Sequence, residues 1–304
     1  MVGAATTVPP VFGFLGGVVT PLMELERVAR PGDAVAFGLD TEICRQFGAS
    51  NAGAGSFLRT ATADVGDSRG WYDIGILRGS DPEQSLQGVM VLAQHAAKQG
   101  MRPVLFACDH TASLAAALGV CRGLAVEPLY LYFDAHFDLG WHLPRTQLDN
   151  GNFVDELMRS GCVAGIVNVG ARSPSSTEAC YRAATDLGWQ PVAPFEVMRR
   201  GLAGHLARHG ERPIYVSIDA DVLDPSSGVN TCCLEPHGLS GADLLSLCRW
   251  LGRTGRVVGA DLSEVRPTAK AGAVDLLLGQ CLRALFDTPE AEDVPQSELA
   301  EVAV

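Results

Sequence analysis

Short apolar runs alternate with longer amphipathic stretches along the chain. Six runs have the length and composition of buried strands, and they begin at residues 34, 103, 129, 164, 213 and 256. Amphipathic stretches typical of helices lie between them, among them 83–99, 176–188, 196–209 and 240–251. Strands that are apolar throughout and separated by helices indicate a parallel sheet covered on both faces. The pattern therefore predicts an α/β fold, a three-layer sandwich with a central, mostly parallel sheet covered by helices on both faces.

The chain shows no internal repeat and no linker long enough to divide it. We expect an N-terminal arm over 1–32, a single domain over 33–288 and an acidic, mobile tail over 289–304. The apolar stretch 8–22 contains three prolines, follows no Lys or Arg and is too short to cross a bilayer. We therefore expect neither a signal peptide nor a membrane span.

Charge and cysteine content narrow the choice of partner and compartment. The formal net charge of -12 argues against a nucleic acid or an anionic membrane as the main partner, because like charges would face each other. A cationic or neutral substrate is expected instead. The nine cysteines are an odd number without a C-x-x-C pair, which is typical of a reducing compartment. The protein is accordingly expected in the cytoplasm.

Four of the apolar runs end in side chains that bind metals. In "DAHFDLG", Asp134, His136 and Asp138 are spaced two apart, so on an extended strand they would point to one face. Ligands bind where the carboxyl ends of parallel strands meet. The same edge should therefore also receive the polar residues that end three other runs, namely Asp109 with His110, Asp219 with Asp221, and Glu264.

Two histidines and four aspartates form an unusual set of ligands. They include too many carboxylates for a tetrahedral zinc site and too many histidines for a calcium site. A pair of divalent ions such as Mn2+, bridged by aspartates, suits this mixture, and it would activate water for a hydrolase. Taken alone, an Asp-x-His or the segment "SIDADVLDP" is as typical of a turn as of a metal site. The combination favours metal, because buried converging charges need a cation or hydrogen bonds.

Three motifs together resemble a known family. "DAHFDLG", "SIDADVLDP" and "DLSEVRP", in this order after a strand that ends in Asp-His-Thr, are similar to the metal motifs of the arginase and agmatinase (ureohydrolase) family. The resemblance covers most of the chain and includes the glycine-rich turn in "GASNAGAGSFLR". It implies an arginase-like fold, an amidinohydrolase that releases urea and an amine from a small cationic guanidino substrate, and a homo-oligomer, either a trimer or a hexamer.

The resemblance also implies roles for individual residues, with two Mn2+ per chain. The ligands of one ion would be His110, Asp134, Asp138 and Asp219. Those of the other would be Asp134, His136, Asp219 and Asp221, with Asp134 and Asp219 bridging. A shared hydroxide would attack the guanidinium carbon, and Glu264 would accept hydrogen bonds from the guanidinium nitrogens. Asp138 and Glu264 thus count among the candidate catalytic residues.

The chain departs from the family pattern in its substrate loops. Val154 stands where arginases have a proton-shuttle histidine, so His142 and His237 are candidate replacements, although a histidine near a site is more often structural. Ser173 and Ser175 stand where an acidic residue would read the α-amino group of arginine. Free L-arginine is therefore not the expected substrate.

A guanidino compound without an α-amino group, or a larger guanidine, is expected instead. The candidates for binding its far end are Asn150, Asn152 and Asp155. Trp141 could pack on an alkyl chain or a cation, or belong to the core.

Two other functions stay open. The same metals could serve a C-N hydrolase for a formimino or other amidine-like group, which would release formamide rather than urea. A non-catalytic family member could instead act as a binding subunit. The six converging ligands argue against that second alternative, because such a set is unfavourable to hold together without metal.

Overall fold

The computed structural model describes residue 14 and residues 20–43, 50–63, 69–140, 148–172 and 178–286. Eight strands form one sheet in the order β2-β1-β3-β8-β7-β4-β5-β6, and all neighbouring pairs are parallel. The strands are β1 (Ala34–Leu39), β2 (Trp71–Leu77), β3 (Arg102–Phe106), β4 (Leu129–Phe133), β5 (Gly165–Val169), β6 (Gln190–Val192), β7 (Ile214–Asp219) and β8 (Val257–Ser263). The predicted α/β sandwich is confirmed.

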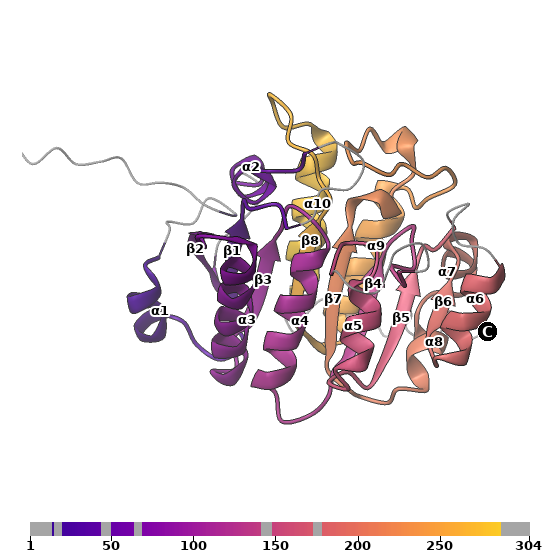
Figure 1. The fold of residues 1–304 in the computed structure, drawn as a ribbon, viewed down its shortest axis with the longest axis horizontal. Coiled ribbons are helices and arrows are strands. Elements are labelled where there is room, and N and C mark those ends of the chain that lie inside the picture. The colour runs from indigo at the N-terminus through magenta and orange to yellow at the C-terminus, as the bar shows by residue number, and fades with distance from the viewer. Residues whose placement is uncertain are drawn as a thin grey trace, which may run out of the picture.

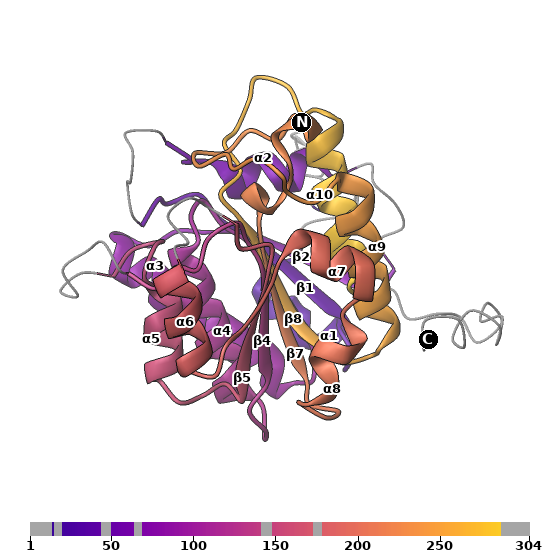
Figure 2. The same cartoon turned by 90° about the vertical axis from the view of Figure 1, so that its right-hand side faces the viewer.

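Helices cover both faces of this sheet (Figures 1 and 2). One face carries α3 (Pro82–Lys98), α4 (Thr111–Gly123), α5 (Phe153–Arg159) and α6 (Glu178–Asp186). The other carries α7 (Pro194–Arg200), α8 (Ala203–Ala207), α9 (Gly241–Arg253) and α10 (Ala273–Ala284). Helix α1 (Leu22–Val28) packs beside β1, and α2 (Ala54–Ala61) lies over the sheet edge beside α10.

The core lies on both sides of the sheet, which explains the continuous apolar runs. In β4, Leu129, Leu131 and Phe133 belong to one buried cluster, and Tyr130 and Tyr132 belong to the cluster on the opposite face. All five side chains are fully buried. Because successive side chains of a strand point to opposite faces, a strand covered by helices on both sides needs apolar residues throughout.

The six predicted strands are β1, β3, β4, β5, β7 and β8, whereas β2 and β6 were missed. These two strands are the edges of the sheet. In β2 only Asp73 is buried, and β6 is three residues long and contains a proline, so neither has the apolar run of a central strand.

The prediction of a single helix over 196–209 is wrong. Helix α7 ends before Gly201, whose φ of 65° is left-handed, and α8 begins at Ala203.

The two ends of the chain differ in what the structure describes. Phe14, within the predicted arm, is buried, with its ring 4.9 Å from that of Trp71 and 5.0 Å from that of Phe106. The predicted tail 289–304 lies outside the described residues. The domain boundaries stay predictions.

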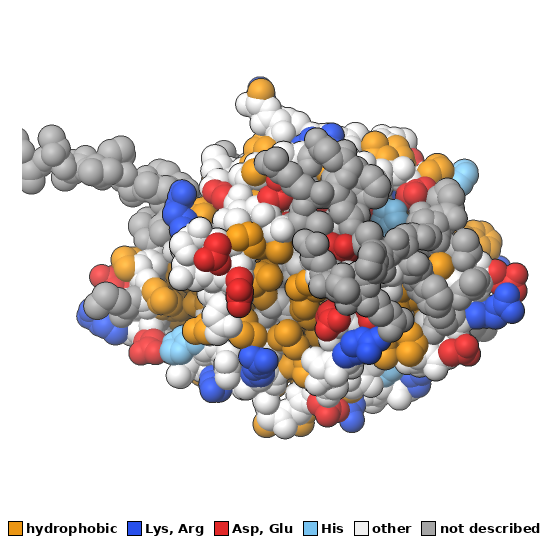
Figure 3. Space-filling model, in the orientation of Figure 1, with side chains coloured by type: hydrophobic (Ala, Val, Ile, Leu, Met, Phe, Trp, Pro, Cys, Tyr) orange, Lys and Arg blue, Asp and Glu red, His pale blue; other side chains and the backbone are white. Residues whose placement is uncertain are grey.

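Helix length and surface charge bear on the partners that the sequence excludes. Among the described helices, none is long and apolar enough to cross a bilayer. Acidic and basic side chains are interspersed over the described part of the face in Figure 3. A mixed surface of this kind gives a nucleic acid no continuous positive track, although the exclusion of such partners stays a prediction.

Candidate metal centre

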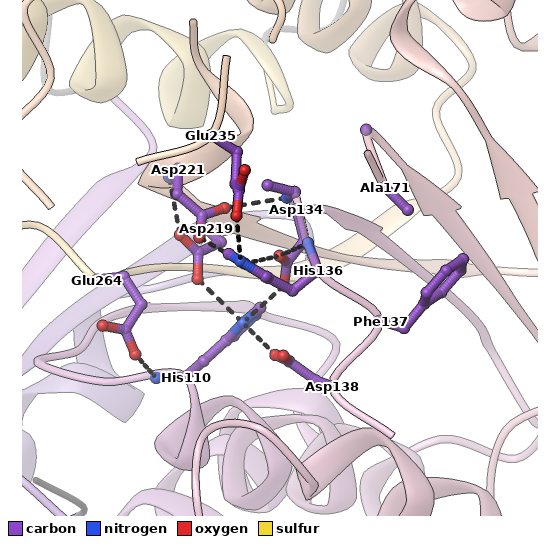
Figure 4. Close-up of polar contacts among 12 residues, drawn as sticks. His110, Asp134, His136, Phe137, Asp138, Ala171, Asp219, Asp221, Glu235 and Glu264 are labelled. Atoms are coloured by element: carbon purple, nitrogen blue, oxygen red, sulfur yellow. Dashed lines mark hydrogen bonds and ion pairs between the residues drawn. The ribbon is translucent and has the colours of Figure 1, made fainter. Parts of the chain in front are cut away.

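The candidate ligands lie at the carboxyl ends of three strands in the middle of the sheet, β3, β7 and β4, and Glu264 follows β8, which lies between β3 and β7. Because these strands are parallel, their carboxyl ends meet at one edge, and the side chains that follow them point toward one another (Figure 4). The six residues brought together here are His110, Asp134, His136, Asp138, Asp219 and Asp221.

One group of ligands surrounds the ring of His110. Its Nδ1 lies 3.1 Å from Asp134 Oδ2, 3.3 Å from Asp138 Oδ2 and 3.3 Å from Asp219 Oδ2. His110 and Asp134 are completely buried. His110, Asp134 and Asp138 each direct one ligand atom into a space small enough for a single metal ion.

A second group lies beside the first and shares Asp134 with it. The Nδ1 of His136 lies 2.9 Å from Asp221 Oδ2 and 3.5 Å from Asp134 Oδ1. Asp134 therefore presents one oxygen to each histidine. Asp134, His136 and Asp221 form the second set that could hold a metal ion.

The backbone places these side chains by a route that differs from the predicted one. The strand β4 ends at Phe133, so Asp134, His136 and Asp138 lie in the turn beyond it rather than on an alternating strand. Asp138 has a φ of 51° and Glu264 a φ of 60°, a left-handed conformation that is uncommon for residues other than glycine. The side chains of Asp134, His136 and Asp138 thus converge because of the turn after β4, in which Asp138 is strained, and not because of the alternation of side chains along a strand.

The electrostatics of this cluster fit a divalent cation. Burial raises the pKa of Asp138 to about 8, with a further rise from the Asp134 carboxylate. Burial, together with Asp221 and Asp134, also raises the pKa of Asp219 well above its ordinary value. Among the described residues, the buried atoms His110 Nδ1 and Asp134 Oδ2 have no hydrogen-bond partner. A cation between these groups would replace repulsion by attraction and satisfy both atoms.

The ring of His110 is held from behind by a hydrogen-bond relay. Its Nε2 lies 2.8 Å from Ser217 Oγ, which donates to Asp261 Oδ1 at 2.7 Å. Asp261 also accepts hydrogen bonds from Ser113 and Tyr215. Because the single proton of the Ser217 hydroxyl goes to Asp261, its oxygen accepts from Nε2–H. Against the effect of burial, Asp134, Asp138 and Asp219 raise the pKa of His110 well above its ordinary value, so Nδ1 also carries a proton in the absence of metal. A cation bound at Nδ1 would replace that proton and leave the Nε2–H form of the ring. This is the tautomer that a metal requires.

Glu264 lies at the rim of the cluster, with 6% of its surface exposed. Its Oε1 accepts from the backbone N–H of His110 at 3.0 Å and from Asn150 Nδ2 at 3.1 Å. Its Oε2 accepts from Asn51 Nδ2 at 2.8 Å. Burial raises the pKa of Glu264 to about 7, and the carboxylate of Asp109 adds to the rise. One lone pair of Oε2 is left for a further donor.

Sequence reasoning missed four residues around this site. Ser217 and Asp261 are the first residues of "SIDADVLDP" and "DLSEVRP", but these motifs predict no role for them. Glu235, whose Oε1 lies 3.7 Å from His136 Nε2, was not singled out either. Asn51 belongs to the glycine-rich turn that resembles the family, but only the fold shows that it reaches Glu264.

The structure also places the other candidates. Asn150 Nδ2 donates to Glu264 Oε1. Asn152 precedes α5, and its Oδ1 accepts from the N–H of Asp149 without capping the helix. Asp155 accepts from Arg159 Nε at 2.8 Å. Val154 is fully buried in the core. His237 lies exposed on its loop with a φ of 64°.

Trp141 and His142 lie outside the described residues, as do Ser173 and Ser175. The roles given to these residues stay predictions.

The chain resembles proteins of known family. It matches the model of the Arginase family over residues 43–285. Formimidoylglutamase of Corynebacterium efficiens is 26% identical over 261 residues, which cover 82% of each protein. Putative agmatinase 3 of Schizosaccharomyces pombe is 28% identical over 191 residues, which cover 59% of this chain but 46% of that protein.

Two solved structures share the fold. Proclavaminate amidino hydrolase from Streptomyces clavuligerus superimposes with a TM-score of 0.75 at 22% identity, covering 91% of this chain and 96% of that one. A variant of Trypanosoma cruzi formiminoglutamase, solved with Mn2+, has a TM-score of 0.75 at 18% identity and covers 88% and 97%. The chain therefore belongs to the arginase family, whose members are hydrolases that act on C-N bonds other than peptide bonds.

Proposed function

We propose that the protein is a binuclear manganese amidinohydrolase that converts a guanidino compound other than free L-arginine to urea and an amine. The observation that carries this proposal is the pair of ligand groups that share Asp134. His110, Asp138 and Asp219 would complete one site, and His136, Asp221 and Asp219 the other. When bound, the metals would activate water as a nucleophile near neutral pH.

The side chains of this chain would bind and orient the planar group of the substrate. Glu264 would accept a charge-assisted hydrogen bond from an N–H of the amidine on the free lone pair of Oε2. Asn51 and Asn150 would hold that carboxylate in place from both oxygens. A carboxylate held in this way would orient the carbon of the amidine toward the attacking water. Holding the two reactants in the right geometry lowers the activation barrier of the reaction.

Hydrolysis of a formimino group is a second candidate. The observation that favours it is the formimidoylglutamase of Corynebacterium efficiens, whose similarity extends over 82% of both proteins. A formimino group is also a planar amidine, so Glu264 and the metals would treat it alike. The released products would distinguish the two reactions, because a formimino substrate yields formamide and a guanidine yields urea.

The test is an assay of product release with Mn2+ supplied. Arginine, agmatine, guanidinobutanoate and N-formimino-glutamate would be compared, with urea and formamide measured separately. We expect urea from a guanidino compound other than arginine. Replacing a residue that supports a metal ligand lowers activity by up to about 100-fold. The variant Asp134→Asn changes a ligand itself, so its activity should fall by more than that. The matched control Asp186→Asn, on an exposed residue at the end of α6, should keep full activity.

Each outcome has a defined meaning. Formamide without urea would favour the second candidate. Absence of both products, together with no binding of Mn2+, would overturn the proposal in favour of the non-catalytic binding subunit.

A further inference from the structure

We propose that Arg266 binds a carboxylate of the substrate, so that the enzyme acts on an amidine with an anionic tail, such as a guanidino acid or a formimino amino acid. This inference rests on the proposed function and names the class of substrate. Arg266 lies two residues after Glu264, in the loop that follows β8.

A chain of contacts links the Arg266 side chain to Glu264. Its Nη2 lies 3.2 Å from Cys232 Sγ, and this thiol lies 3.5 Å from Asn51 Oδ1. The amide of Asn51 donates to Glu264 Oε2 at 2.8 Å. The guanidinium is therefore separated by two side chains from the carboxylate that would hold the amidine.

The backbone of Arg266 is fixed in this place. Its N–H donates to the carbonyl of Asn230 at 2.8 Å, and Asn230 Nδ2 donates to the carbonyl of Arg266 at 3.0 Å. The loop between Asn230 and Glu235 then runs along the cluster, where Glu235 faces His136. These two hydrogen bonds thus tie Arg266 to the loop that carries Glu235.

The charge of Arg266 lacks a matching acid. Among the described residues no carboxylate pairs with its guanidinium, and the buried Nε has no hydrogen-bond partner. The thiol of Cys232 is only a weak acceptor. By contrast, Arg59 is paired with Asp73, and Arg172 donates to the carbonyl oxygens of Asp221 and Glu235.

A partly buried cation without an acid costs free energy that an incoming carboxylate would offset. The planar guanidinium presents paired N–H donors, and a carboxylate accepts them in a bidentate geometry. A substrate with a cationic amidine at one end and a carboxylate at the other would then meet Glu264 and Arg266 with complementary charges. A tail that ends in an amine, as in agmatine, would meet repulsion at Arg266.

The test compares Arg266→Gln and Arg266→Lys with the wild type on three amidines. Guanidinobutanoate and N-formimino-glutamate carry carboxylates, and propylguanidine carries no tail charge. We expect Arg266→Gln to lower kcat/KM on the carboxylate substrates about 10- to 100-fold, mainly through KM, and Arg266→Lys to lower it less. Propylguanidine should be affected little, and Arg249→Gln, an exposed arginine of α9, should behave as the wild type.

Two results would overturn the inference. An equal loss on propylguanidine would mean that Arg266 only holds the loop in place. A wild type that prefers agmatine would contradict the charge argument.

Calorimetric binding of glutarate, which lacks an amidine, gives a readout that is independent of catalysis. Binding that Arg266→Gln weakens would uphold Arg266 as the carboxylate site even if no amidine were hydrolysed, in which case only the proposed function would fail.

Discussion

Single residues behind the metal ligands decide how well the ligands are held. Ser217 and Asp261 fix the ring of His110, and they do so from β7 and β8, far away in the sequence. Both residues lie in motifs that the sequence analysis uses, but their contact with His110 joins three separate segments of the chain, so the sequence predicts the ligands and not the residues that support them. The same holds for Asn51, which meets Glu264 only because α2 folds over the end of the sheet.

The variant Ser217→Ala tests the relay at the scale of one residue. Without the hydroxyl, His110 Nε2 loses its acceptor and the ring loses its orientation. We expect the affinity for Mn2+ to fall about 10- to 100-fold, measured by calorimetric titration. The control Ser246→Ala removes an exposed hydroxyl of α9 that donates to the carbonyl of Ala242. Equal affinities of the two variants would contradict a role for the relay.

Titration of Asp138 gives a prediction for the metal-free protein. Its pKa rises from an ordinary value of 3.8 to about 8 in the folded state, chiefly because of burial. The folded state then binds this proton more tightly than the unfolded state does, so the contribution to stability is fully present below about pH 4 and is lost as the pH rises to about 8. Thermal unfolding in a chelator should show this loss in the wild type.

The variant Asp138→Asn removes that titration and serves as the reference. Between pH 4 and pH 8 its stability should fall less than that of the wild type, and added Mn2+ should restore the wild type at the upper end. Parallel pH profiles of the two metal-free proteins would contradict the argument.

At the scale of elements, burial decides what the sequence can predict. The six inner strands are buried on both faces by helices and appear as apolar runs, whereas the edge strands β2 and β6 are partly exposed or short. Amphipathic spacing predicted one helix over 196–209, because the pattern continues across Gly201. The break there depends on a backbone conformation that hydrophobic periodicity does not report.

Two glycines in this segment offer a matched pair of variants. Gly201 has a φ of 65°, and Gly204 lies within α8, while an added Cβ would meet no atom within 4 Å at either position. Gly201→Ala should lower the free energy of unfolding by about 1–3 kcal/mol, because a φ of 65° with a ψ of -173° is a conformation that essentially only glycine adopts. Gly204→Ala should raise it by about 0.4–1 kcal/mol. Denaturant titration measures both, and equal signs would contradict the explanation.

At the scale of the whole molecule, one parallel sheet brings the carboxyl ends of β3, β7 and β4 together, which places the six candidate metal ligands side by side, with Glu264 from the end of β8 next to them. The family resemblance predicts a trimer or a hexamer. This assembly and the cytoplasmic location both stay predictions. Light scattering coupled to size-exclusion chromatography would measure the assembly. A mass of one chain at micromolar concentration would contradict the expected oligomer.

The central claim is that two Mn2+ ions share Asp134, and elemental analysis of metal per chain after dialysis tests it most directly. We expect two Mn2+ per wild-type chain. In Asp134→Asn we expect the loss of both ions, because each site loses the same carboxylate. A wild type that binds one ion or none, or a variant that keeps both, would contradict a shared binuclear centre.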